Sequence, residues 1–238
     1  MEVNLVIKIV IYLKKRDVLH YKELIAAHRV YYRRERRAKN YDRYIKEQKK
    51  WEKWNNPDIP IDEIEKLFHF IRSWDQWSQG DAEIFQGIYK EIFPLIEKLR
   101  NERIENADFN REDLKITVRD IFEKVAYCTP MGRLGRYEST DASKILHTIL
   151  PHFFVMWDDA IKDALVNGKN DGETYAFEFL PMMQQELIEA IETCRTERNL
   201  DREEAIKYIR EQTGYQTLAK LLDEYNYAKY TLRYPLTS

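Results

Sequence analysis

The sequence predicts an all-α protein, and three observations lead to this fold class. Only 7 of the 238 residues are glycine, which helices disfavour and tightly turned β proteins need. Apolar side chains recur at helical spacing along most of the chain, and strand patterns are nearly absent beyond the first dozen residues. With 44% hydrophobic and 34% charged residues, the chain has the composition of a globular protein and can bury a core as one main helical domain.

The N-terminal part of the chain is basic, and residues 1–54 contain neither proline nor glycine. Residues 14–53 hold fifteen lysines and arginines against six acidic residues, a local charge of +9. Because the whole chain carries −2, the remainder carries −11. We therefore predict a basic N-terminal helical segment over residues 1–54, with one or two helices from about Val18 to Trp54, and a helical core domain over residues 55–238.

The predicted core domain consists of helices separated by short breaks. A proline-containing break over residues 55–60 precedes Asp62 and Glu65, which have the spacing of a capping box. Asp81 opens the strongest helical stripe, which continues past Pro94 to Leu99. Further helices are expected over about 111–127, 141–150, 158–167, 173–195, 201–213 and 215–230.

Several classes of protein are disfavoured by the sequence. Cys128 and Cys194 are far apart and form no CxxC motif, which argues against a disulfide framework or a zinc knuckle. The apolar stretch over residues 3–13 is too short to span a bilayer. The five histidines lack an HExxH pattern, and there is no phosphate-binding or dinucleotide-binding glycine motif. We therefore expect a cytoplasmic protein with no metal, no cofactor and no membrane partner, and the sequence leaves the oligomeric state open.

The stretch from Asp141 to Lys162 is the segment of the chain in which we expect chemistry. It predicts a helix, a stop at Pro151, an apolar crossing and a second helix opened by Asp158. Lys144 lies in the first turn of the first helix, where the helix dipole disfavours an ammonium group. A lysine must lose its proton before it can act as a nucleophile. The structural alternative is that Lys144 is a solvated lysine and Asp158 is only an N-cap.

This arrangement resembles the core of the helix-hairpin-helix DNA glycosylases, over about residues 128–167. In that family an early helical lysine attacks the sugar C1′ in the bifunctional members, and an invariant aspartate opens the next helix. The resemblance implies that Lys144 is the Schiff-base nucleophile and that Asp158 activates it or stabilises the oxocarbenium ion. The family's glycine-bearing hairpin is missing before Lys144. The nearest glycines lie with Arg133 and Arg136 in a loop that we expect to contact phosphate.

A second candidate for nucleic-acid contact is the basic run in the N-terminal segment. Its arginines, interleaved with tyrosines, suit the neutralisation of phosphates and the stacking of exposed bases. The arginines that we predict to bind nucleic acid here are Arg33, Arg34, Arg36 and Arg37. The alternative is a solvated helix face that pairs with the acidic remainder of the protein.

Together, these patterns predict a DNA-associated protein, with a degenerate helix-hairpin-helix type of base-excision glycosylase/lyase as the enzymatic hypothesis. Under this hypothesis the target base is flipped into an aromatic-lined pocket beside Lys144 and Asp158. The alternative is a non-catalytic helical protein that acts as a scaffold or binds another protein through its acidic surface.

Overall fold

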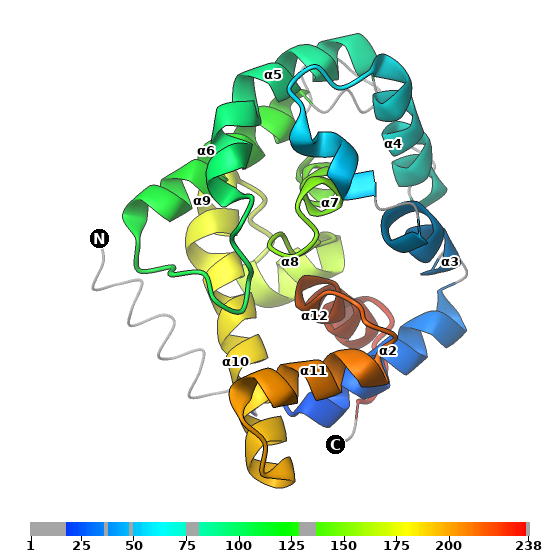
Figure 1. The fold of residues 1–238 in the computed structure, drawn as a ribbon, viewed down its shortest axis with the longest axis vertical. Coiled ribbons are helices and arrows are strands. Elements are labelled where there is room, and N and C mark those ends of the chain that lie inside the picture. The colour runs from blue at the N-terminus through cyan, green and yellow to red at the C-terminus, as the bar shows by residue number, and fades with distance from the viewer. Residues whose placement is uncertain (1–17, 36–37, 48–49, 75–80, 129–136, 237–238) are drawn as a thin grey trace.

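The computed structural model describes residues 18–35, 38–47, 50–74, 81–128 and 137–236, and every regular element in this part of the chain is helical (Figure 1). The predicted all-α fold is therefore confirmed. In chain order, the elements are α2 (Tyr21–Arg34), α3 (Ala38–Tyr41), η1 (Asp42–Glu47), η2 (Lys50–Asn55), α4 (Ile61–Trp74), α5 (Ala82–Leu99), α6 (Glu112–Cys128), α7 (Ser139–Ile149), α8 (Asp159–Val166), α9 (Gly172–Thr174), η3 (Tyr175–Phe179), α10 (Leu180–Arg198), α11 (Arg202–Gln212), α12 (Leu218–Asn226) and η4 (Tyr227–Thr231).

The basic N-terminal segment does not form one long helix. Helix α2 ends at Arg34, and Glu35 leaves it in an extended conformation. The Glu35 carboxylate accepts a hydrogen bond from the Tyr227 hydroxyl at 2.9 Å, a tertiary contact that the local pattern does not reveal. Along its apolar face α2 packs against α10, α11 and α12, and its buried side chains belong to the same core as the rest of the described chain. The apolar stretch over residues 3–13 lies outside the described residues.

The predicted helix starts agree with the structure at most positions. Asp81 caps α5 by accepting from the backbone N–H groups of Glu83 and Ile84, both at 3.0 Å. Asp201 and Glu204 form the expected capping box at the start of α11. The capping box predicted at Asp62 is wrong, because α4 already begins at Ile61 and the Asp62 carboxylate pairs with Lys66 one turn further on.

Helix α7 lies in the middle of the molecule, encircled in Figure 1 by helices from both ends of the described chain. It packs against α6, α4 and η2, and almost all of its residues are buried. After α7 the chain crosses back through a buried apolar stretch, residues 153–157, and enters α8 at Asp158. This crossing brings the start of α8 next to the start of α7. A hydrogen bond joins the two, in which the Trp157 indole N–H donates to the Ser139 carbonyl at 3.1 Å.

Helix α12 is buried along its whole length although four of its residues are strongly polar. A helix that is buried all round is normally apolar, so these side chains need partners inside the protein. The polar residues are Lys220, Asp223, Glu224 and Asn226. Among the helices of the described ranges, none combines the length and the apolar character that crossing a membrane requires.

Candidate functional site

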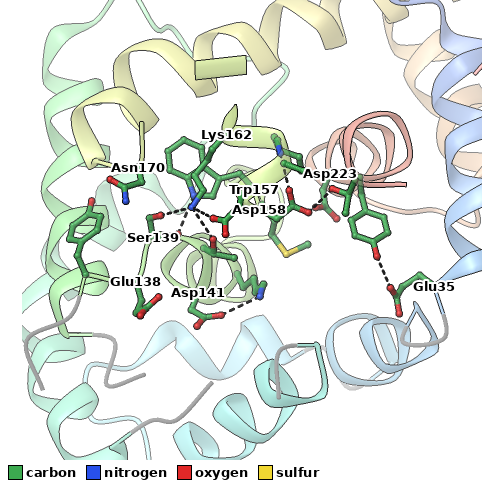
Figure 2. Close-up of a pocket in the computed structure, with 18 of the residues that line it drawn as sticks. Glu35, Glu138, Ser139, Asp141, Trp157, Asp158, Lys162, Asn170 and Asp223 are labelled. Atoms are coloured by element: carbon green, nitrogen blue, oxygen red, sulfur yellow. Dashed lines mark hydrogen bonds and ion pairs between the residues drawn. The ribbon is translucent and has the colours of Figure 1, made fainter. Parts of the chain in front are cut away.

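A pocket of about 590 Å³ opens where the N-termini of α7 and α8 meet. Its wall is completed by residues from the end of α2, from α12 and from η4. Figure 2 shows Glu138 and Asn170 at one end of the pocket, Glu35 and Asp223 at the other, and Asp158 between them. The pocket therefore brings together residues as far apart in the sequence as Tyr31 and Thr231.

Lys144 lines this pocket from the second turn of α7. The predicted position in the first turn is wrong, because the helix already begins at Ser139. Its Nζ donates to Asp141 Oδ1 at 3.2 Å, and the side chain retains an exposed fraction of 14%. The spacing of three residues along a helix brings these two side chains to one face. Lys144 is thus a partly exposed amine with a proton acceptor beside it, rather than a fully solvated lysine.

Asp158 lines the same pocket and caps α8. Its Oδ1 accepts from the Ile161 backbone N–H at 2.9 Å, which is the N-cap contact that the sequence predicted. Its Oδ2 accepts from the Thr231 hydroxyl at 2.6 Å. Both oxygens are therefore fixed, and the carboxylate is held rigidly in the wall of the pocket. The structure brings Lys144 and Asp158 to a common cavity.

Lys162 is a second amine in the pocket, which the sequence analysis did not single out. Its Nζ donates to Ser139 Oγ at 3.0 Å and to Thr140 Oγ1 at 3.1 Å, and it pairs with Asp159 at 2.8 Å (Figure 2). The side chain is nearly buried, with an exposed fraction of 7%. These contacts tie the first turn of α8 to the first turn of α7. The only sequence signal for Lys162 was its position one helical turn after Asp158.

Asp223 is another ionisable side chain of the pocket that the sequence analysis did not single out. It reaches the pocket from α12, and its Oδ2 accepts from Lys220 Nζ at 2.5 Å inside the protein. Burial raises the pKa of Asp223 to about 6, although the Lys220 cation opposes this shift. Lys220 is fully buried. Burial lowers its pKa, and the neighbouring Asp223 and Glu224 carboxylates more than offset that effect and leave the pKa above its usual value.

His147 is a fully buried packing histidine on α7. Its Nδ1–H donates to the Phe154 carbonyl at 2.6 Å, and its Nε2 accepts from the Tyr41 hydroxyl at 2.8 Å. Burial lowers its pKa to about 3, so the ring is neutral throughout the physiological range. Within the described ranges, no three His, Cys, Asp or Glu side chains are grouped as metal ligands would be.

The charged side chains that line the pocket are mostly acidic. Six carboxylates and two lysines contribute to the described lining: Glu35, Glu138, Asp141, Asp158, Asp159 and Asp223 with Lys144 and Lys162. A phosphate group would be repelled by this lining, whereas a neutral or cationic group would be accepted. Any contacts with phosphate must therefore come from outside this lining, as the sequence analysis expects of its arginines.

The predicted nucleic-acid ligands are described only in part. Arg33 and Arg34 are exposed in the last turn of α2, directly before Glu35, which lines the pocket. Arg36, Arg37, Arg133 and Arg136 lie outside the described residues.

Comparisons with models of protein families, with curated proteins and with solved structures give no match to this chain.

Proposed function

We propose that this protein acts on DNA as a base-excision glycosylase/lyase, with Lys144 as the nucleophile and Asp158 as the stabilising carboxylate. The observation that carries the proposal is that both side chains line one pocket of about 590 Å³. A flipped nucleotide needs such a cavity beside the reacting groups. The resemblance of residues 128–167 to the helix-hairpin-helix glycosylases assigns the same two roles.

The surroundings of Lys144 suit a nucleophilic amine. Asp141 Oδ1 lies 3.2 Å from Nζ, within reach to accept the proton that the amine must lose. Lys144 lines the pocket near the N-terminal end of α7, in the wall of the space that a flipped nucleotide would occupy. After the base departs, the neutral amine adds to C1′. The C1′–O4′ bond then breaks, O4′ takes a proton from the nitrogen, and a protonated Schiff base remains.

Asp158 suits the stabilisation of positive charge on the sugar. Two hydrogen bonds fix its oxygens, so the carboxylate does not need to reorganise when charge develops at C1′. The acidic lining limits which part of the substrate can enter the pocket. The base and the sugar are compatible with it, whereas a phosphate group is not. The phosphates of the DNA must stay outside the pocket, and we infer that Arg33 and Arg34, which are exposed, contact them.

Borohydride reduction tests the covalent step. With an oligonucleotide that carries an abasic site, the wild-type chain should give a reduced, covalent protein–DNA adduct. Lys144→Ala should abolish the adduct, and Asp158→Asn should slow its formation about 10²-fold, as expected for the loss of a preorganised electrostatic contact. Lys207→Ala, which removes an exposed amine on α11, should leave the adduct unchanged. Equal trapping by wild type and Lys144→Ala would show that another amine forms the adduct and would contradict the role of Lys144. No adduct with the wild-type chain would favour the alternative, a non-catalytic interaction protein.

Salt dependence tests the contribution of the exposed arginines to DNA binding. If Arg33 and Arg34 each neutralise one phosphate, replacing both with glutamine should reduce the slope of log K against log salt by about 2. The matched control replaces two exposed cations on α10 and α11, Arg195 and Lys207, with glutamine. Binding isotherms at several salt concentrations give the slopes, and equal slopes for the two double variants would rule out a specific role for Arg33 and Arg34.

A further inference from the structure

Asp223 combines three features that no other described carboxylate in the pocket shares. It lines the cavity, it is almost buried, and a fully buried cation holds one of its two oxygens. Its other oxygen, Oδ1, accepts no hydrogen bond from the described residues. Asp223 therefore presents one unengaged oxygen at the end of the pocket that also contains Glu35 (Figure 2).

The groups around Asp223 favour its neutral form in spite of the ion pair. Glu224 on the same helix and Asp158 at the start of α8 are carboxylates whose charges raise its pKa, and burial contributes most of the increase to about 6. Lys220 is the cation that opposes them. The other titratable groups whose electrostatic interactions reach this cluster are two histidines and several phenols. His28 Nδ1 lies 2.7 Å from Glu224 Oε2, and the buried His147 interacts with Lys220. The phenols are those of Tyr31, Tyr32, Tyr41, Tyr175 and Tyr227.

The two carboxyl groups at this part of the pocket have different environments. Asp158 accepts two hydrogen bonds and has no vacant oxygen, whereas Asp223 has a vacant oxygen and a raised pKa. Two carboxyl groups with contrasting environments in one site are the usual arrangement for an acid and a charge-stabilising partner. A base leaving from C1′ takes the electron pair of the glycosidic bond, and it departs more readily when a proton reaches it.

We propose that Asp223 is the general acid of base excision in this pocket, an inference that rests on the proposed glycosylase function. The C1′–N bond breaks, its electron pair stays on the base nitrogen, and the Asp223 carboxyl proton moves to the base. The positive charge left on the sugar lies beside Asp158 until the Lys144 amine adds to C1′. Asp223, ionised by this step, is neutralised by Lys220 until it takes up a proton from solvent.

The test compares a neutral base with a cationic one. The substrates are duplex oligonucleotides that carry either hypoxanthine or 7-methylguanine. Hypoxanthine is neutral and needs a proton to depart readily, whereas 7-methylguanine already carries a positive charge. Under single-turnover conditions, wild-type release of hypoxanthine should fall about tenfold per pH unit above pH 6, while release of 7-methylguanine stays flat. Asp223→Asn should slow hypoxanthine release by 10²-fold or more and change 7-methylguanine release less than threefold. Asp163→Asn, an exposed carboxylate on α8, is the matched control.

Trapping on a ready-made abasic site separates this inference from the proposed function. Wild-type chain that gives no adduct there overturns the proposed function itself. If the adduct forms, three results would overturn the general-acid role. The first is the same pH profile for release of the two bases, and the second is an equal slowing of both releases in Asp223→Asn. The third is that the wild-type chain releases neither base. The wild-type pH profiles decide the question even if Asp223→Asn fails to fold.

Discussion

Replacing Lys220 with methionine is expected to lower the free energy of unfolding by about 3 to 5 kcal/mol. Lys220 is fully buried and lies 2.5 Å from Asp223 Oδ2 and 3.9 Å from Glu224 Oε1. Its Nζ also lies over the rings of Tyr31 and Tyr41, at 4.2 and 4.7 Å from their centroids. Removing the cation leaves the buried Asp223 carboxylate without its counter-charge, and Glu224 keeps only the contact of its other oxygen with His28 at 2.7 Å. Removing one partner is the costly way to break a buried ion pair. Urea denaturation at pH 7 measures the change.

Two further variants identify the cause of this destabilisation. Lys207→Met removes an exposed lysine on α11 and should change the free energy of unfolding by less than about 0.5 kcal/mol. The double variant Lys220→Met/Asp223→Asn should recover part of the lost free energy of unfolding, because it also removes the unpaired charge of Asp223. A Lys220→Met protein as stable as wild type would show that the buried ion pair does not stabilise α12.

Acid sensitivity that depends on His147 is the second large effect that we expect. The folded-state pKa of His147 is about 3, against an ordinary value of 6.5, so between these values the unfolded chain binds more protons. Stability from this group is complete above pH 6.5 and is lost as the pH falls towards 3. Between pH 6.5 and 4.5 the loss amounts to about 2 kcal/mol. His152, whose burial lowers its pKa to about 4, acts in the same direction.

Asp223 has the opposite effect on stability to that of His147 and His152 over part of this pH range. Its folded-state pKa of about 6 exceeds the ordinary 3.8, so protonation in that window stabilises the folded chain. The informative quantity is therefore the difference between wild type and His147→Asn, in which the amide keeps a donor near the Phe154 carbonyl. That difference should shrink by about 2 kcal/mol from pH 6.5 to 4.5. A constant difference would mean that His147 is not buried in its neutral form.

The sequence predicted the helical fold because its strongest signals are local. Asp81, Asp158 and Asp201 are N-caps whose side chains bond to backbone groups two or three residues away, and such contacts are visible in sequence. The end of α2 at Arg34 was not predictable, since the Glu35 carboxylate is held by Tyr227 from the other end of the chain. The N-cap of α2 was missed because it is His20, a residue seldom used as a cap.

The candidate site was predictable only where its residues are close in sequence. Lys144 and Asp158 belong to one helix–crossing–helix unit, so their common pocket follows from local structure and a short connection. Asp223 and Lys220 lie on a helix that is buried all round. From the spacing of apolar residues alone, the charged positions of a helix are assigned to the side that faces solvent. Only tertiary packing shows that both charges are buried and that Asp223 reaches the pocket.

The identity of the reacting amine is the central claim, and peptide mapping of the borohydride-reduced adduct tests it most directly. Two partly or largely buried lysines line the pocket, Lys144 from α7 and Lys162 from α8, so the modified peptide distinguishes them. Modification at Lys144 in the wild-type chain is the predicted result. An adduct on Lys162 or on an exposed lysine, or no modified peptide at all, would contradict the assignment.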